Sequence, residues 1–231
     1  PKHAAPIDLK LDANEGKAPH QELLRRVVED GPDIMRRYPD ASKLQAKLAE
    51  YVGAPAQNVL PTCGGDDALD RLCRAVLCPG RELLTTDPSF EMLPRYARIM
   101  GADITEIDWP RGPYPTDELI AQIKPETTVV AVVSPNNPSG AVASAQDLRR
   151  LSAAAPNAVL LVDLAYVEFA DEDLTPVALS LPNTVVVRTL SKAWGCAGLR
   201  VGYAVGPEEL IFWMRAAGGP YAVALPSVAL A

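Results

Sequence analysis

Histidine is almost absent from this chain of 231 residues, which has only His3 and His20, both near the N-terminus. A catalytic triad that uses histidine, or a metal site built on histidine, is therefore not the expected chemistry. The four cysteines include no Cys-x-x-Cys pair, so we expect free thiols and no zinc framework. Chemistry has to come from Lys, Asp, Tyr, Ser and Asn side chains, or from a cofactor that they hold.

Long apolar runs and clustered basic residues are also missing. No run approaches the roughly 18 residues that a membrane helix needs, and residues 1–11 lack the apolar core of a secretory signal. We therefore expect no membrane segment and a cytoplasmic location. The net charge is −7, whereas a nucleic-acid surface needs clustered Lys and Arg. The sequence predicts small-molecule partners and no nucleic acid.

From residue 58 onward, short β-branched runs alternate with amphipathic stretches. This alternation predicts an α/β fold with a mostly parallel seven-stranded sheet and helices on both faces. Only residues 190–200 separate the last two strands, too few for a helical crossover, so we expect those strands to be antiparallel. The expected strands are Asn58–Pro61, Glu82–Thr86, Asp103–Ile107, Thr128–Ser134, Ala158–Asp163, Thr184–Thr189 and Val201–Val205, and the expected helices are Asp66–Leu77, Ser89–Met100, Thr116–Ile123, Ala143–Ala153 and Pro207–Ala216.

The first part of the chain has no strand pattern. His20–Glu29 and Ser42–Tyr51 are expected to be helices, the second with Ser42 as its N-cap and Gly53 just past its end. We predict that residues 1–52 form an N-terminal arm and helices belonging to a small domain or a dimer contact, and that residues 53–231 form the large domain. Residues 221–231 are an apolar stretch, after which we expect a further C-terminal piece.

The densest group of reactive residue types is Thr-Leu-Ser-Lys-Ala-Trp-Gly-Cys-Ala-Gly-Leu-Arg-Val-Gly-Tyr, residues 189–203. Thr189 and Ser191 lie two residues apart, and so on one face, at the end of a valine-rich strand. These two hydroxyls and the guanidinium of Arg200 suit a phosphate group. Lys192 beside them can condense with an aldehyde. The alternative is an ordinary surface loop.

Two other strands also end in polar residues. Asp163 closes an apolar run, where open α/β sheets place their ligands, and a buried carboxylate needs a cation such as a protonated pyridine nitrogen. Tyr166 lies close enough to reach the hydroxyl of the same ring, and Asn137 can donate to that oxygen. Asp163 as the cap of the following turn, and Asn137 as a stabiliser of its own turn, remain open alternatives.

Residues 62–67, Thr-Cys-Gly-Gly-Asp-Asp, follow a strand and open a helix, so the backbone amides of Gly65 and Asp66 can bind an anion. The pattern is neither a Walker loop nor a dinucleotide fingerprint, and Asp66 can equally be the N-cap. Phe90, at the start of the next expected helix, can stack on a planar ring or belong to the core.

Taken in this order, these segments resemble the fold-type I pyridoxal-phosphate aminotransferases of class I and II. The resemblance extends over nearly the whole chain and is most specific at residues 191–202, with support from residues 137–140 and 163–166. Residues 11–15 and 37–40 look most like the histidinol-phosphate aminotransferase branch. The resemblance implies the large domain of that fold, with pyridoxal phosphate as cofactor, and a C-terminal small domain that these residues do not include.

The resemblance also implies a role for each candidate residue. Lys192 would hold the cofactor as a Schiff base and move a proton, and Asp163 would keep the pyridine nitrogen protonated. Around the rest of the cofactor, Tyr166 and Asn137 would bind the ring hydroxyl, Phe90 would stack on the ring, and Gly65, Asp66, Thr189, Ser191 and Arg200 would surround the phosphate.

Two more residues carry implied roles at the edge of the site. Tyr38 would reach the phosphate bound by a partner subunit, which implies a homodimer with shared sites, and Asn14 would lie on the substrate side. The implied reaction moves an amino group from an amino acid, or a phosphorylated amine such as histidinol phosphate, to a 2-oxo acid such as 2-oxoglutarate. Such a reaction belongs to amino-acid biosynthesis, in this branch to that of histidine.

The sequence departs from the branch at two places. Residues 16–19 read Gly-Lys-Ala-Pro in place of Asn-Pro-Tyr-Gly, and Ala222 stands in place of an asparagine. The amino donor is therefore left open. The alternatives are a pyridoxal-phosphate decarboxylase of a phosphorylated amino acid and a non-catalytic α/β domain.

Overall fold

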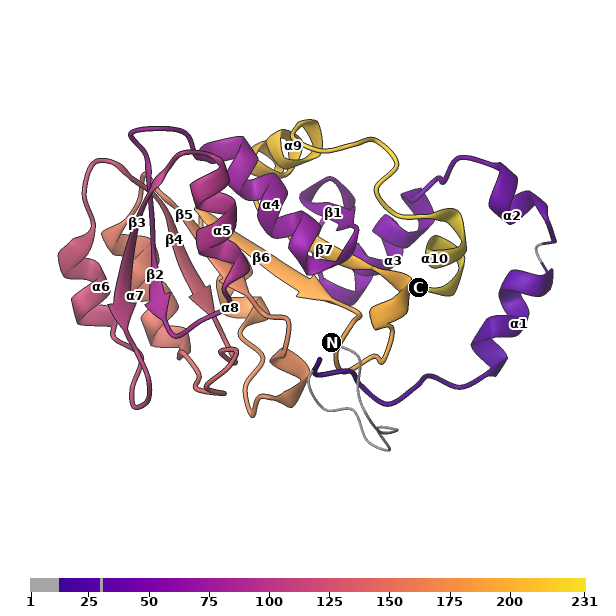
Figure 1. The fold of residues 1–231 in the computed structure, drawn as a ribbon, viewed down its shortest axis with the longest axis horizontal. Coiled ribbons are helices and arrows are strands. Elements are labelled where there is room, and N and C mark those ends of the chain that lie inside the picture. The colour runs from indigo at the N-terminus through magenta and orange to yellow at the C-terminus, as the bar shows by residue number, and fades with distance from the viewer. Residues whose placement is uncertain (1–12, 30) are drawn as a thin grey trace, which may run out of the picture.

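The computed structural model describes residues 13–29 and 31–231 of the chain. Its centre is a seven-stranded sheet in the order β1-β7-β6-β5-β4-β2-β3 (Figure 1). The neighbouring strands are parallel, except that β7 runs antiparallel to both β1 and β6. The mostly parallel sheet and the reversed last strand are thus confirmed. The strands are β1 Val59–Thr62, β2 Glu82–Asp87, β3 Asp103–Asp108, β4 Thr127–Val133, β5 Val159–Asp163, β6 Thr184–Thr189 and β7 Gly202–Val205.

Helices cover both faces of this sheet, as predicted (Figure 1). Alternate side chains of β4 enter opposite cores: Val129 and Val133 pack beneath one layer of helices, and Val130 and Val132 beneath the other. Because both faces are buried, the residues from Val129 to Val133 are apolar without interruption. The first layer contains α4 Gly64–Val76, α5 Met92–Ile99 and α9 Glu208–Ala216, and the second contains α6 Thr116–Gln122, α7 Ala145–Ala154 and α8 Thr175–Leu179.

The N-terminal helices gather at the β1 end of the sheet (Figure 1). Leu44 and Leu48 of α3 pack with Val59 and Tyr203 in a third apolar cluster. Two short helices, α1 and α2, contact α10 near the C-terminus. The predicted division after residue 52 remains a prediction, and residues 1–12 of the expected arm lie outside the described residues. The bounds are α1 Glu22–Glu29, α2 Asp33–Arg36, α3 Ser42–Val52 and α10 Leu225–Leu230, with 3₁₀ turns η1 Ala56–Asn58, η2 Val167–Phe169 and η3 Ala197–Leu199.

One expected helix cap is wrong. Ser42 is the first residue of α3 and caps nothing with its side chain, and the N-cap position belongs to Ala41. The Asp40 carboxylate instead accepts a hydrogen bond from the backbone N–H of Ser42 at 2.9 Å, so an acid two residues upstream satisfies that amide. At the other end, Gly53 adopts the left-handed conformation with φ 70°, as predicted.

Two helices that border the strand ends also begin at residues other than those expected. α4 starts at Gly64 rather than Asp66, because Asp67 closes the first turn by accepting a hydrogen bond from the backbone N–H of Cys63. α5 starts at Met92 rather than Ser89, whose hydroxyl donates to Asn136 in another loop.

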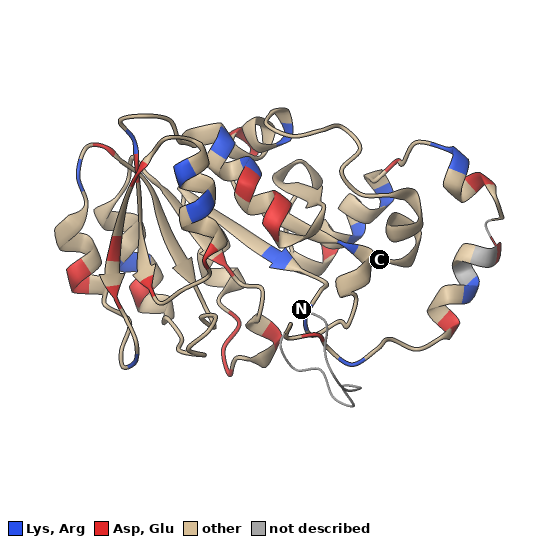
Figure 2. Cartoon of the chain, in the orientation of Figure 1, with Lys and Arg blue, Asp and Glu red and all other residues tan. Residues whose placement is uncertain are grey.

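Acidic and basic residues are interspersed over the helices (Figure 2). No helix among the described residues is long and apolar enough to cross a bilayer.

Candidate active site

A cavity of about 440 Å³ opens at the carboxyl ends of the parallel strands. This is the edge at which open α/β sheets bind ligands, because the loops that follow neighbouring strands converge there. The structure brings the predicted site residues together around this cavity, with Tyr38 as the exception. The predicted residues that line it are Asn14, Gly65, Asp66, Phe90, Asn137, Asp163, Tyr166, Thr189, Ser191, Lys192 and Arg200.

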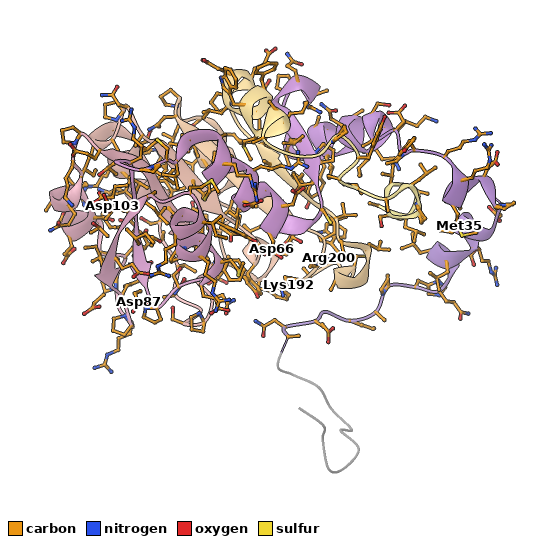
Figure 3. All side chains as sticks on the ribbon, turned by 45° about the horizontal axis from the view of Figure 1, so that its top comes forward. Met35, Asp66, Asp87, Asp103, Lys192 and Arg200 are labelled. Atoms are coloured by element: carbon orange, nitrogen blue, oxygen red, sulfur yellow. The ribbon has the colours of Figure 1, made fainter. Side chains whose placement is uncertain are left out.

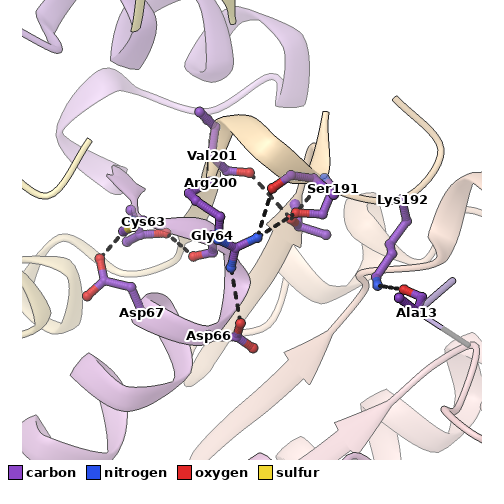
Figure 4. A network of polar contacts seen from close by, with 12 residues as sticks. Ala13, Cys63, Gly64, Asp66, Asp67, Ser191, Lys192, Arg200 and Val201 are labelled. Carbon is purple, nitrogen blue, oxygen red and sulfur yellow. Dashed lines mark hydrogen bonds and ion pairs between the residues drawn. The ribbon is translucent and has the colours of Figure 1, made fainter. Parts of the chain in front are cut away.

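One end of the cavity is an anion cup between α4 and the loop after β6 (Figure 4). Gly65 and Asp66 lie in the first turn of α4, where backbone N–H groups have no partner within the helix. The Thr189 hydroxyl donates to the Ser191 hydroxyl at 2.9 Å, and Nη1 of Arg200 donates to the same oxygen at 3.3 Å. Helix amides, hydroxyls and a guanidinium therefore face one small volume.

Glycines make this cup possible. Gly64 has φ 79°, and a Cβ there would lie 2.6 Å from Nη2 of Arg200. Gly202, on β7, passes so close to α4 that a Cβ would lie 2.6 Å from the backbone nitrogen of Gly65. A side chain at either position would push the guanidinium or the helix amides out of place.

Lys192 lies beside the cup, at the start of the loop that joins β6 to β7 (Figures 3 and 4). Its Nζ donates a hydrogen bond to the backbone carbonyl of Ala13 at 3.2 Å. The same Nζ lies 5.6 Å from the centroid of the Tyr166 ring. Lys192 is half-buried and lines the cavity, which differs from the alternative of an ordinary surface loop.

Asp163 is the last residue of β5, and its side chain is buried at the other end of the cavity. Desolvation raises the pKa of its carboxyl to about 6, a hydrogen bond from the backbone N–H of Ala165 lowers it in part, and the charge of Asp66 raises it further. The bond from Ala165, 3.0 Å long, is the turn cap that the sequence left open. The carboxyl caps the turn and also faces the cavity, where a cation would stabilise its charged form.

Tyr166 and Asn14 form the wall toward a second, larger cleft. Nδ2 of Asn14 donates to the Tyr166 hydroxyl at 3.1 Å, and both residues line the 440 Å³ cavity and the adjoining cleft of about 1130 Å³. Asn137 also lines both spaces, so it is placed to donate into the cavity. Tyr38 lies elsewhere: its exposed ring stacks on that of Tyr221, with centroids 4.5 Å apart.

The sequence did not indicate the importance of Asn136. This buried amide joins two loops, since its Nδ2 donates to the Pro88 carbonyl and to the Ser139 hydroxyl, both at 2.8 Å, and its Oδ1 accepts from Ser89. Its role is to hold the Asn137 loop against the loop that carries Phe90. No local pattern distinguishes it from Asn137, because Pro88 and Ser89 lie far away in the sequence.

The donor set fits pyridoxal phosphate. The cup supplies amides, hydroxyls and Arg200 for a phosphate, buried Asp163 supplies the anion for a protonated pyridine nitrogen, and Lys192 supplies an amine for the aldehyde. Within residues 13–29 and 31–231, no group of three His, Cys, Asp or Glu side chains is arranged to hold a metal ion.

Fold and site together define the cofactor-binding domain of a fold-type I pyridoxal-phosphate protein. The chain belongs to the family of class I and II aminotransferases, whose family model matches residues 6–231. Members of this family use pyridoxal phosphate as their cofactor. The family predicted from the sequence is thereby confirmed.

Relatives of this chain carry different activities. The histidinol-phosphate aminotransferase of Methanosarcina mazei is 35% identical over 228 residues, which are 95% of this chain and 61% of that protein. The aromatic amino acid aminotransferase of Mycobacteroides abscessus is 34% identical over 218 residues, 91% of this chain and 62% of that protein. The chain thus spans about three fifths of the length of these relatives.

Solved structures share the fold. The histidinol-phosphate aminotransferase from Sinorhizobium meliloti, in complex with pyridoxal-5′-phosphate, has a TM-score of 0.84 and 24% sequence identity to this chain. The match covers 94% of this chain and 61% of that one. At this identity the similarity shows the shared fold, which agrees with the predicted large domain.

Proposed function

We propose that this chain is the cofactor-binding part of an enzyme that moves an amino group from an amino donor to a 2-oxo acid. The observation that carries the proposal is the placement of Lys192, Asp163 and Arg200 around one cavity. An amine, a buried carboxylate and an anion cup are the three anchors that pyridoxal phosphate needs. When bound, the cofactor supplies an electron sink for the bonds of the donor carbon.

Each residue has a defined task in this reaction. Lys192 would hold the cofactor covalently, and its Nζ would also be placed to move a proton to or from the donor carbon. Asp163 keeps the ring nitrogen protonated, and the neighbouring cation keeps its carboxyl charged. Tyr166 and Asn137 bind the ring hydroxyl, Phe90 covers the ring face, and the cup of Gly65, Asp66, Thr189, Ser191 and Arg200 holds the phosphate.

A homodimer is part of the proposal. Tyr38 is 78% exposed and does not line the 440 Å³ cavity. Tyr38 is therefore assigned to the phosphate bound by a second copy of the chain. Cofactor affinity that falls on dilution below the dimer dissociation constant, and that Tyr38→Ala lowers only in the dimer, supports this assignment. Affinity independent of concentration contradicts it.

Two classes of amino donor are candidates for this chain. A phosphorylated amine of the histidinol phosphate type is proposed from the similarity to histidinol-phosphate aminotransferases. An aromatic amino acid is the second candidate, because the adjoining cleft is lined by Tyr114, Tyr166 and Phe169. The charged side chains that line this cleft among the described residues are all acidic, Glu15, Asp147, Asp171 and Glu172, and they offer no partner to a phosphate. Asn14, at its junction with the cavity, is assigned to the substrate side.

The first experiment tests cofactor attachment. The purified chain is mixed with pyridoxal phosphate, reduced with borohydride, digested and mapped by mass spectrometry. Label on Lys192, and a visible absorption band that Lys192→Ala removes, are the expected results. Lys47→Ala is the matched control, because Lys47 is exposed on α3. Label distributed over surface lysines contradicts the proposal.

The second experiment separates donors and reaction types. Loss of the visible band is followed as histidinol phosphate, phenylalanine, tyrosine or a phosphorylated amino acid is added, and CO₂ is measured in parallel. Bleaching without CO₂, restored by 2-oxoglutarate, supports amino transfer. Release of CO₂ favours the decarboxylase instead, and no bleaching by any donor favours a non-catalytic domain.

A further inference from the structure

The two groups closest to the proposed reaction lie on different loops. Lys192 follows β6 and Tyr166 follows β5, and the lysine Nζ lies 5.6 Å from the centroid of the tyrosine ring. Both must keep fixed positions around one cofactor, since a displacement of about 1 Å can cost on the order of 100-fold in rate. A contact between the two loops is therefore needed to fix their relative position.

The Glu168 carboxylate makes this connection. Its Oε1 accepts a hydrogen bond from Nε1 of Trp194 at 3.2 Å and another from Nη2 of Arg188 at 2.7 Å. Glu168 lies in the turn η2, directly after Tyr166, and Trp194 lies in the loop that Lys192 opens. One carboxylate oxygen therefore links the tyrosine loop to the lysine loop.

Arg188, a residue of the sheet, fixes the position of the Glu168 carboxylate. It lies on β6 next to Thr189, and because side chains alternate along a strand it occupies the face away from the anion cup. Its side chain is 5% exposed. Nη1 donates to the Thr175 hydroxyl at 3.3 Å, and the guanidinium lies 3.8 Å from the Asp173 carboxylate. A buried guanidinium without partners is costly, so Arg188 holds Glu168 in one position.

Aromatic contacts hold Trp194 against the same cluster. Its ring meets that of Tyr51 edge to face, with centroids 6.0 Å apart and an interplanar angle of 78°. The guanidinium of Arg188 lies 5.5 Å from the centroid of the Tyr51 ring. Helix α3, which carries Tyr51, thus closes a cluster of Tyr51, Glu168, Arg188 and Trp194 behind the cavity.

We propose that Glu168 is a positioning residue for Lys192: through Trp194 it sets the place of the lysine loop relative to Tyr166. The inference rests on the proposed function, because it concerns the covalent bond between Lys192 and the cofactor. Glu168 and Trp194 do not line the cavity, and so they act on the lysine and not on the phosphate. Binding through Lys192 and binding through the phosphate can therefore be measured separately.

The test compares two ligands on the full chain and its variants by titration calorimetry. Pyridoxal phosphate uses the cup, the ring contacts and the Lys192 amine, whereas 4′-deoxypyridoxine 5′-phosphate has no aldehyde and uses the cup and the ring contacts without the amine. Trp194→Phe keeps an aromatic ring and removes the N–H donor together with part of the ring area, a loss of area that Trp213→Phe reproduces elsewhere. Because the hydrogen bond to the charged Glu168 is partly screened at the half-exposed Trp194, we expect an affinity for pyridoxal phosphate about three- to tenfold lower. Affinity for the deoxy analogue should change less than about twofold.

Two further variants complete the design. Trp213→Phe, on α9, is the matched control and should leave both affinities unchanged. Glu168→Gln keeps an acceptor for Trp194 but removes the charge facing Arg188, and should also weaken pyridoxal phosphate more than the analogue. Equal losses for the two ligands, or no loss in Trp194→Phe, overturn the inference alone. A wild-type chain that binds pyridoxal phosphate no more tightly than the analogue contradicts the proposed function, and the inference with it.

Discussion

The guanidinium of Arg200 forms an ion pair with the carboxylate of Asp66, with Nη2 and Oδ2 3.2 Å apart, at the edge of the anion cup (Figure 4). The backbone amide of Asp66 belongs to the cup, whereas its side chain offers the guanidinium a competing anion. Asp66 therefore both builds the proposed phosphate site and opposes its occupation.

Replacing this carboxylate by an amide should strengthen anion binding. Asp66→Asn keeps the backbone amide and removes the competing charge, so the affinity for inorganic phosphate should rise by about two- to fivefold at low ionic strength, a modest change because the pair is half-exposed. The loss of an acidic residue from the first turn of α4 should cost about 0.5 kcal/mol of stability. Phosphate titrations and urea unfolding measure the two effects.

Asp70→Asn is the control for that substitution. Asp70 lies on the same helix and pairs with Arg74 at 2.7 Å, so its loss also removes one acidic charge from α4. Its phosphate affinity should stay close to that of the wild type. Equal gains in both variants would assign the effect to net charge rather than to competition for Arg200.

The buried Asp163 carboxyl should make stability depend on pH. Burial raises its pKa to about 6, above the ordinary value of 3.8, so the unfolded chain releases this proton first as the pH rises. Its contribution to stability is complete below about pH 4 and is lost as the pH passes about 6, a change on the order of 2–3 kcal/mol. Urea unfolding of the cofactor-free chain across this range measures it.

Asp163→Asn should remove this part of the pH dependence. Without cofactor, the variant should be more stable than the wild type at pH 7 by about 1–3 kcal/mol and similar to it near pH 4. Added pyridoxal phosphate should stabilise the wild type more than the variant, because a protonated ring nitrogen needs the carboxylate. Asp171→Asn, an exposed carboxylate, is the control. A variant with the wild-type pH profile contradicts this assignment.

The sheet, and the grouping of the candidate site residues at one edge of it, could be predicted from the sequence because both depend on local patterns. The central parallel strands β4, β5 and β6 are buried and contain apolar runs, and polar residues at or directly after the ends of such runs share one edge of the sheet. The short connection before residue 201 was enough to predict the reversed β7. Ser42 was assigned wrongly as a cap because the helix begins one residue earlier than the sequence indicated, with Ala41 as the N-cap and the Ser42 amide bound by Asp40.

The supporting contacts could not be predicted in this way. Asn136 meets Pro88, and Arg188 meets Glu168, through pairings between segments that only the folded chain brings together. In sequence, Arg188 is a charged residue inside a valine-rich strand, and alternation gives its face but not its partner Glu168. The stacking of Tyr38 on Tyr221 also joins residues that are far apart in the sequence, so it could not be predicted either.

The cysteines should differ in reactivity by burial. Desolvation raises the pKa of the buried Cys73 thiol to about 12, with a further rise from the charge of Asp70, so little thiolate forms at pH 8. Cys78, five residues further on, is exposed. A thiol reagent should label Cys78 rapidly and Cys73 only on unfolding, as peptide mapping would record. Rapid labelling that persists in Cys78→Ser and maps to Cys73 contradicts the burial argument.

Strand β7 approaches the N-terminus of α4 closely at Gly202. A Cβ at Gly202 would lie 2.6 Å from the nitrogen of Gly65, so Gly202→Ala has to separate the strand from the helix terminus. We expect a loss of stability of about 1–3 kcal/mol and, because the cup amides move, weaker phosphate binding. Gly219→Ala is the control, since a Cβ there has no neighbour within 4 Å, and its effect should stay within about 0.5 kcal/mol. A Gly202→Ala variant that loses stability but binds phosphate normally would show that the approach serves packing and not the cup.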